Sequence, residues 1–291
     1  MILPRVGVCT DVGRIRDGNE DSFVAIDGLY LVADGMGGHS AGEVASAIAV
    51  GILADLFTSA DGGLSDEHRV TDAVATANLA IFMEAIDDPG KTGMGTTLTG
   101  LVVADALSHR AVVINVGDSR TYLWRHGELR QITKDHSHVQ SLVDRGAITR
   151  AEARVHFQRN IVLRAMGIES HVDVDTFPLD VEDGDRFIVC SDGLVDEASD
   201  DEIEVEIREA TDAQDLADRL VNLANRNGGR DNITVIVVDF ETVVEPVVAP
   251  PELGGGNEMS RPSRWFAVGA WGMFALSAAI AITVVVSALV S

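Results

Sequence analysis

The sequence contains little cysteine. Its 291 residues include two cysteines, Cys9 and Cys190, and neither has the CxxC or Cys/His spacing of a zinc site or a disulfide framework. Both lie in apolar runs, so we expect reduced thiols in the core of a cytosolic domain. This scarcity argues against a disulfide-stabilised secreted domain and against a zinc-binding module.

Positive charge is scarce as well. The chain has 22 Lys and Arg residues against 46 Asp and Glu residues, a formal net charge of -24. This balance argues against a nucleic-acid partner, because no basic patch offsets the repulsion from phosphates. It favours binding of divalent cations wherever carboxylates converge. The N-terminal sequence MILPRVGVCTDVG lacks a basic segment followed by a long apolar run, so we predict no signal peptide.

Charge is also absent from residues 265–290, WFAVGAWGMFALSAAIAITVVVSALV. About 20 apolar residues span a bilayer as a helix, so this segment is predicted to be a transmembrane helix. A buried core helix is the alternative, but a helix of this length that is apolar on all sides favours the membrane. Arg261 and Arg264 precede the segment and predict a single-pass C-terminal anchor with the preceding domain in the cytoplasm. Residues 241–264, rich in Pro and Gly, are predicted to be a linker after a folded domain of residues 1–240.

Within that domain, short apolar and β-branched runs are separated by turn signals such as DG and HG, which favours antiparallel pairing. Strands clustered apart from helices predict an α+β fold, a sandwich of two mainly antiparallel sheets flanked by helix pairs. Between residues 134 and 167 we expect two short helices outside the sheets. The predicted strands cover residues 5–9, 22–26, 29–33, 97–103, 111–116, 121–124, 172–177, 186–190 and 233–240, and the long helices cover 41–57, 68–86, 200–210 and 213–227.

Four aspartates stand at the ends of these strands. A charge at the end of a buried strand is costly unless something pairs with it. A single such residue is commonly a turn residue or a helix cap, but four of them, mostly beside glycine, indicate a shared site. Glu20 and Asp21 precede another strand in the same manner. The four are Asp34 in VADGMGG, Asp118 in NVGDSR, Asp192 in VCSDGL and Asp231 in GGRDNITV.

Carboxylates that meet at one edge of a sandwich repel one another unless cations are present. Ligation by oxygen alone selects Mg²⁺ or Mn²⁺, so we predict that Asp34 bridges two such ions and that Gly35 offers its carbonyl. Paired hard cations activate water and stabilise an in-line displacement at phosphorus, and the sequence has no nucleophile-elbow motif. Arg16 is the candidate for holding a substrate phosphate, although taken alone it would be an exposed loop arginine.

These residues together resemble the metal-dependent Ser/Thr protein phosphatases of the type 2C family, especially the bacterial branch. The matching segments occur in the family's order and cover nearly all of residues 1–240. They are RDGNED, VADGMGGHSAGEVAS, GMGTTLTG, NVGDSRTYLW, QITKDHSHVQSLV, VCSDGLVD and GGRDNITVIVV.

The resemblance implies an α-β-β-α sandwich with a binuclear Mn²⁺ or Mg²⁺ centre. It implies hydrolysis of phosphoserine and phosphothreonine in proteins by water activated on that centre, countering membrane Ser/Thr kinases. A non-enzymatic pseudophosphatase that binds phosphoproteins is the alternative, and a phosphatase of anti-sigma-factor antagonists is a third, although that type usually carries appended sensor domains. The implied roles are metal ligation by Asp34, Asp192, Asp231 and the Gly35 carbonyl, an outer shell of Glu20 and Asp21, a third ion at Asp118, phosphate binding by Arg16, and a flap over residues 135–167.

The sequence departs from the family pattern at two positions. Met36 stands where animal members carry a histidine proposed as general acid, so that role is unassigned here. Asn160 stands where bacterial members offer a flap serine to the third metal, which puts that ion's occupancy in question. His136 and His138 are expected to be solvated or to face the substrate, and not to bind metal.

Overall fold

The computed structural model describes residues 2–37, 41–59, 67–105 and 109–242. Apart from residues 241 and 242, the predicted linker lies outside these ranges, as does the whole predicted transmembrane segment at 265–290. Both therefore stay predictions. Contacts divide the chain into the units Met1–Glu245 and Pro246–Ser291, and the first of these holds every described element.

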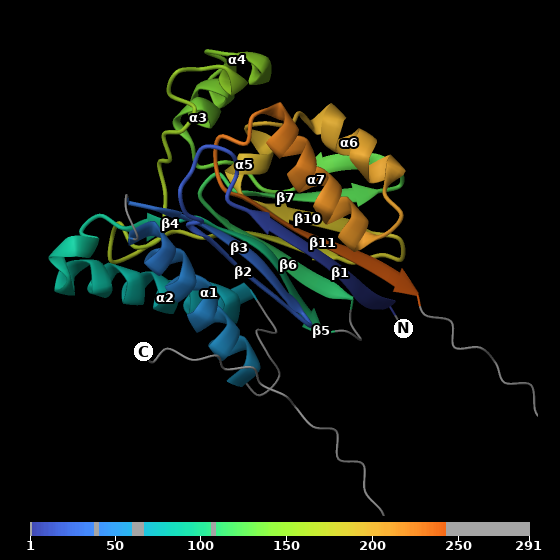
Figure 1. Cartoon of the computed structure of the whole chain (residues 1–291). Coiled ribbons are helices and arrows are strands. Elements are labelled where there is room, and N and C mark those ends of the chain that lie inside the picture. The colour runs from blue at the N-terminus through green and yellow to red at the C-terminus, as the bar shows by residue number, and fades with distance from the viewer. Residues whose placement is uncertain (1, 38–40, 60–66, 106–108, 243–291) are drawn as a thin grey trace, which may run out of the picture. The chain divides into compact units, whose positions relative to one another are not determined.

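Two antiparallel sheets are stacked in the described part of the chain (Figure 1). The first has the strand order β1-β11-β10-β7-β8 and the second the order β2-β3-β5-β6-β9, with β4 paired to β3. The first sheet consists of β1 (Ile2–Asp11), β11 (Ile233–Thr242), β10 (Arg186–Cys190), β7 (Arg120–Arg125) and β8 (Glu128–Gln131). The second consists of β2 (Asp21–Ile26), β3 (Leu29–Met36), β5 (Leu98–Asp105), β6 (Arg110–Val116), β9 (Asp175–Asp180) and β4 (Gly95–Thr96).

Helices cover the outer faces of both sheets. α1 (Ala41–Ser59) and α2 (Glu67–Asp87) lie on the second sheet, and α6 (Asp200–Glu209) and α7 (Ala213–Asn227) lie on the first (Figure 1). The short α5 (Asp192–Val195) follows β10, and a 3₁₀ turn, η1 (Pro89–Lys91), follows α2. The α-β-β-α sandwich predicted from the sequence is therefore confirmed.

Alternation along the strands builds the layers. In β3, Leu29, Leu31 and Ala33 pack toward α1 and α2, whereas Tyr30 and Val32 pack into the core between the sheets. Successive side chains of a strand point to opposite faces, so a strand covered on both sides has an unbroken apolar run. This is why the apolar run at residues 29–33 predicted a buried strand.

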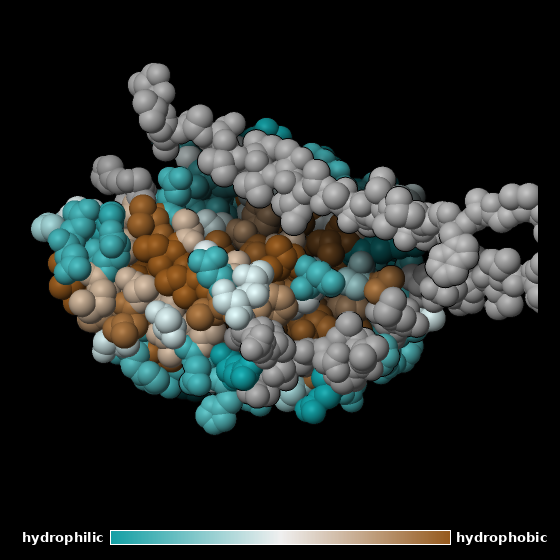
Figure 2. Space-filling model, turned by 90° about the horizontal axis from the view of Figure 1, so that it is seen from below, coloured by the Kyte–Doolittle hydropathy of each residue, from teal (hydrophilic) through white to brown (hydrophobic). Residues whose placement is uncertain are grey.

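Small residues on one face of α1 allow this helix to pack closely on the second sheet. Ala41, Ala45, Ala49 and Leu53 recur at the spacing of one helix face and are buried against the sheet. By length and composition α1 is also apolar enough to cross a membrane, but this buried stripe identifies it as a core helix. The outward faces of α1 and α2, seen in Figure 2, are partly apolar as well. On these two helices Leu56, Leu79, Met83 and Ile86 are exposed.

The segment between β8 and β9 lies outside the sandwich and contains α3 (His138–Asp144) and α4 (Arg150–Arg154) (Figure 1). The prediction of two short helices there is confirmed. Ser137 caps the N-terminus of α3, where its hydroxyl accepts a hydrogen bond from the Gln140 amide, and a capping box formed by Thr149 and Glu152 precedes α4. The predicted flap covered residues 135–167; from here on we call residues 134–164 the flap, because this is the segment that runs from the end of β8 through α3 and α4.

One predicted strand is displaced, and the short strands β4 and β8 were not predicted. The strand predicted at residues 172–177 runs instead from Asp175 to Asp180, while Val172 is a buried loop residue. β8 was missed because its sequence ELRQ alternates exposed and half-buried residues without an apolar side to detect. It forms by pairing with β7, a contact that its own residues do not signal.

Replacing Phe187 by Ala should destabilise the fold by about 3–5 kcal/mol, the usual cost of emptying a buried aromatic site. Phe187 is fully buried between the sheets and contacts Phe240 edge to face at 5.8 Å between ring centroids. Urea unfolding of the 291-residue chain in detergent measures the change. The matched variant Phe23→Ala, at a side chain 39% exposed on β2, should cost less than about 1 kcal/mol. Equal losses for the two variants would contradict the assigned core.

Candidate metal centre

Strand ends from both sheets bring acidic side chains into one cavity of about 970 Å³. Asp34 lies near the end of β3, Asp118 in the turn between β6 and β7, Asp192 at the start of α5, and Asp231 just before β11. The convergence predicted from the sequence is therefore present. Also lining this cavity are Arg16, Glu20, Gly35, Met36 and Asn160.

The carboxylates resist ionisation in this setting. Desolvation by burial, followed by the charge of Asp192, raises the pKa of Asp34 well above its ordinary value. Burial and then Asp118 do the same to the pKa of Asp192. Burial, with a smaller effect from Asp135, raises the pKa of Asp118 to about 7. Grouped carboxylates whose pKa values are raised in this way lack a counter-charge.

Two carboxylate oxygens support a cation as that counter-charge. Oδ1 of Asp192 and Oδ1 of Asp21 are buried and have no hydrogen-bond partner within the described ranges. A buried acceptor without a donor is costly, and the cost is relieved by a bound ion as well as by a proton. Hard divalent cations prefer such oxygen ligands. The residues present therefore fit Mn²⁺ or Mg²⁺.

The carboxylates nevertheless do not form a complete set of ligands around one ion position. Among the described residues, no three His, Cys, Asp or Glu side chains are grouped closely enough to hold one ion. The Asp231 carboxylate is engaged elsewhere, because Oδ2 accepts a hydrogen bond from Arg16 at 2.6 Å and Oδ1 accepts one from the Asn232 amide at 2.8 Å. Asp231 thus lines the same cavity as Asp34 while its carboxylate pairs with Arg16.

Asp21 is held by residues on either side of the site. Its Oδ2 accepts hydrogen bonds from the Ser191 hydroxyl at 2.8 Å and the Thr234 hydroxyl at 2.7 Å. Burial raises the pKa of Asp21 to about 6, partly offset by these two hydrogen bonds. Ser191 directly precedes Asp192. Its hydrogen bond to Asp21 therefore helps to fix the backbone position of Asp192.

Asn232 is a site residue that sequence reasoning missed. Its Oδ1 accepts from the Glu20 amide, and its Nδ2 donates to the carbonyls of Val12 and Gly18, each at 2.8–2.9 Å. Asn232 thereby fixes both ends of the loop that carries Arg16. The only signal in the sequence was its position beside Asp231.

Gly35 has a structural reason for lacking a side chain. A Cβ at this position would lie 2.2 Å from the Gly42 carbonyl oxygen, so β3 and α1 approach too closely for any other residue. This contact keeps the Gly35 backbone on the cavity wall beside Asp34. Metal ligation by the Gly35 carbonyl stays a prediction.

The expectation for His136 was wrong. Its side chain is 9% exposed, and Nδ1 accepts a hydrogen bond from the Gly117 amide at 3.0 Å, immediately before Asp118. Nε2 lies 3.1 Å from Oδ2 of Asp175 and 3.0 Å from Nη1 of Arg164, so the whole ring is enclosed by polar partners. Burial lowers the pKa of His136. The tight turn at Gly117 needs an acceptor for its amide, and His136 supplies it; His138 begins α3 and is half-buried.

Comparison with known proteins identifies the family to which this chain belongs. A family model described as Protein phosphatase 2C matches residues 17–234. The serine/threonine protein phosphatase PstP of Mycobacterium tuberculosis is 40% identical over 267 residues, which cover 90% of this chain but 51% of PstP. The chain thus spans about half the length of that relative. The serine/threonine phosphatase stp of Listeria monocytogenes is 39% identical over 238 residues, covering 79% of this chain and 93% of stp.

Solved structures show the same likeness. The crystal structure of M. tuberculosis PstP has a TM-score of 0.77 at 42% identity, and the match covers 83% of this chain and 100% of that one. The PstP catalytic domain in complex with two manganese ions has a TM-score of 0.76 at 40% identity, with 83% and 100% coverage.

In EDTA, the chain should lose stability relative to its Asp118→Asn variant as pH rises from about 4 to about 7. An unfolded aspartate titrates near pH 4, whereas the folded-state pKa of Asp118 is raised to about 7. The folded state thus holds this proton more tightly, and its stabilising effect is complete below about pH 4 and lost as pH passes the folded pKa. Thermal unfolding followed by circular dichroism measures the difference.

Added Mn²⁺ should remove this loss in the parent chain, because the ion replaces the proton at the carboxylates. The exposed Asp201, at the start of α6, provides the control variant Asp201→Asn, which should track the parent across the pH range. A parent chain that gains stability over Asp118→Asn as pH rises in EDTA would overturn the electrostatic description of the cavity.

Proposed function

We propose that the chain, which belongs to the protein phosphatase 2C family, hydrolyses phosphoserine and phosphothreonine in proteins. The observation that carries the proposal is the convergence of Asp34, Asp118, Asp192 and Asp231 in one cavity with Arg16. The two relatives described above are themselves named serine/threonine phosphatases. An acidic cavity that contains one arginine suits cations and a phosphate group together.

The cofactor we propose is a pair of Mn²⁺ or Mg²⁺ ions. Asp34, Asp192 and Asp231 would hold them with the Gly35 carbonyl, and Asp118 would hold a third. The unpartnered, buried Oδ1 of Asp192 supports this assignment, as do the two manganese ions in the related PstP catalytic domain. When bound, the ions would supply an activated water and stabilise the charge of an in-line displacement at phosphorus.

Arg16 is proposed to bind and orient the substrate phosphate. Its side chain is 47% exposed at the cavity wall, where its guanidinium pairs with Asp231. A guanidinium can bind two phosphate oxygens at once, and the fixed loop below it limits its range of motion. Asn232 provides that fixed point.

The leaving oxygen of serine or threonine needs a proton. Met36 lines the cavity at the position where animal members place a histidine, and its thioether carries no proton to give. We therefore propose that water in the cavity, and not residue 36, protonates the leaving group. The alternative of a phosphoprotein-binding pseudophosphatase predicts that a cavity carboxylate has been lost, yet all four aspartates are present.

Asp192→Ala should lower the Mn²⁺-dependent rate of p-nitrophenyl phosphate hydrolysis by at least about 100-fold. Loss of residues that only support metal ligands commonly costs 10–100-fold, and Asp192 is assigned as a ligand itself. The exposed Asp201→Ala provides a control with the same charge change and should keep the parental rate. Parental activity in Asp192→Ala would exclude the proposed centre, and no Mn²⁺-dependent activity in the parent would favour the pseudophosphatase.

We further propose that residues 265–290 anchor the domain to the cytoplasmic face of a membrane, where it reverses the action of membrane Ser/Thr kinases. Two domains tethered to one bilayer meet at a raised effective concentration, which favours this pairing. The support is the 26-residue segment without charge and the two arginines before it.

Expressed in bacteria, the 291-residue chain should sediment with membranes and resist extraction by high salt, because an inserted apolar helix is not held by charge. A chain ending at residue 264 should stay in the supernatant and retain p-nitrophenyl phosphate hydrolysis. Recovery of the longer chain in the soluble fraction would refute the anchor and leave the catalytic proposal intact.

A further inference from the structure

The flap has a charge opposite to that of the rest of the chain. Residues 134–164 contain six Lys and Arg residues and three Asp and Glu residues, in a chain of net charge -24. A positive segment beside an acidic cavity attracts anions that the remaining surface repels. The basic residues are Lys134, Arg145, Arg150, Arg154, Arg159 and Arg164.

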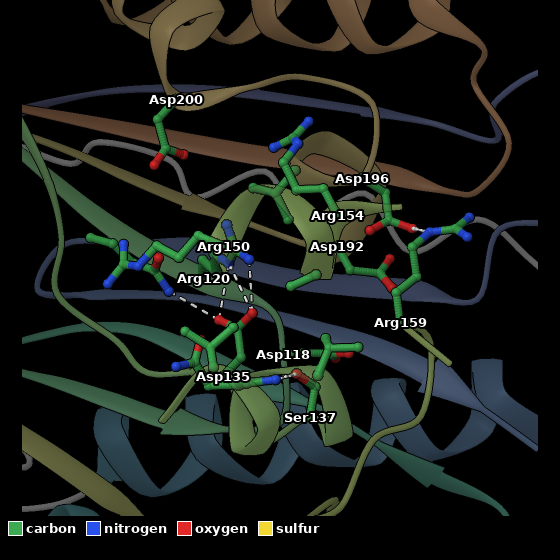
Figure 3. Close-up of a pocket in the computed structure, with 16 residues that line it drawn as sticks. Asp118, Arg120, Asp135, Ser137, Arg150, Arg154, Arg159, Asp192, Asp196 and Asp200 are labelled. Carbon is green, nitrogen blue, oxygen red and sulfur yellow. Dashed lines mark hydrogen bonds and ion pairs between the residues drawn. The ribbon is translucent and has the colours of Figure 1, made fainter. Parts of the chain in front are cut away.

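A second cavity lies between the flap and the sandwich, with a volume of about 120 Å³ (Figure 3). Residues of α3 and α4 line it on the flap side, and Asp196 and Val195 line it near α5. Asp118 and Asp192 line this cavity and the metal-site cavity as well, so the two are adjacent. A peptide bound at one can therefore extend to the other.

Two of the four arginines that line this second cavity are neutralised. Arg120 donates a pair of hydrogen bonds to Asp135, at 2.9 Å from Nε and 2.8 Å from Nη2. Arg159 forms an ion pair with Asp196 (Figure 3), with 3.4 Å between Nε and Oδ2. These pairs fasten the flap to the sandwich and leave no surplus charge.

Arg150 and Arg154 form no such close ion pair with a described residue. They are one helical turn apart on α4, so their side chains share one face of the helix. Arg154 donates to the Ala198 carbonyl at 3.1 Å and forms no ion pair in the described part of the chain. Arg150 makes neither a hydrogen bond nor an ion pair with any described residue. Asp144 lies within electrostatic reach of Arg150 and Glu202 within reach of Arg154, but neither carboxylate forms an ion pair with these arginines, so both guanidinium groups keep free donors.

We propose that Arg150 and Arg154 bind a second phosphate group of the substrate, so that the preferred substrates are segments phosphorylated on two nearby serines or threonines. This inference rests on the proposed phosphatase function and specifies its substrate class. A phosphate dianion matches the charge of two guanidinium groups, and each can donate two parallel hydrogen bonds to its oxygens. While Arg16 holds the phosphate that is removed, the flap arginines hold the phosphate that remains.

Peptides with one phosphothreonine and a non-hydrolysable phosphonate two or three residues away test the proposal, because only one group can then be released. The reference peptide carries alanine at the second position, and a third peptide carries glutamate. For the parent chain, kcat/KM should be about tenfold higher with the phosphonate than with alanine, the factor that one charge-assisted hydrogen bond supplies. The glutamate peptide should gain less, since its charge is smaller.

The double variant Arg150→Ala/Arg154→Ala should reduce the ratio of kcat/KM between the phosphonate and alanine peptides to about one. A matched double variant, Arg5→Ala/Arg145→Ala, removes the same charge at residues outside the cavity and should keep the tenfold ratio. Arg150→Lys/Arg154→Lys should keep part of it. An unchanged ratio in the alanine double variant, an equal loss in the matched variant, or an equal gain from glutamate would each overturn the proposal.

Calorimetry separates this inference from the proposed function. Binding of peptides in which a phosphonate also replaces the phosphothreonine does not require turnover. If the parent hydrolyses none of the peptides yet binds the doubly charged one about tenfold more tightly, and the alanine double variant does not, the second site stands and the phosphatase function fails. If the parent hydrolyses all three peptides equally and shows no such binding preference, the phosphatase stands and the second site fails.

Discussion

Mutual repulsion among carboxylates at one end of the sandwich is the constraint on which the site depends. Asp34, Asp118 and Asp192 would be unstable neighbours as anions, and burial holds their pKa values above the ordinary range. Such a cluster is stable only when cations or protons compensate its negative charge. The buried Oδ1 of Asp192 has no hydrogen-bond donor among the described residues, so at this atom the compensation has to come from a bound ion or a proton.

The packing of the two sheets fixes the positions of these aspartates. Three of the four aspartates follow or end strands whose side chains alternate between two packed layers, so these strands cannot slip by one residue without exposing their apolar faces. The position of each aspartate is therefore fixed by the packing of residues on its own strand. The close backbone contact between Gly35 and Gly42 further restricts how β3 can shift relative to α1. The same packing of the strands therefore stabilises the core and sets the positions of the aspartates.

Charge is distributed between two parts of the molecule. The sandwich carries the acidic excess, while the flap carries a basic excess and contacts the sandwich through Arg120–Asp135 and Arg159–Asp196. His136 extends the connection to the turn before Asp118. The flap is thus joined by polar contacts to the part of the sandwich that carries the proposed metal ligands. Arg150 and Arg154 remain available for a ligand.

The sequence by itself determined the helices, most strands and the identity of the acidic residues. These features depend on local periodicity and on residue type, as in the helix at residues 213–227, which the structure reproduces with the same bounds. The tertiary structure decided the edge strand β8, the burial of His136, the clamp formed by Asn232 and the pairing of Arg16 with Asp231. That last pair joins residues 215 positions apart. Such contacts form only when both sheets have closed on each other, and no local pattern in the chain encodes the distance between them.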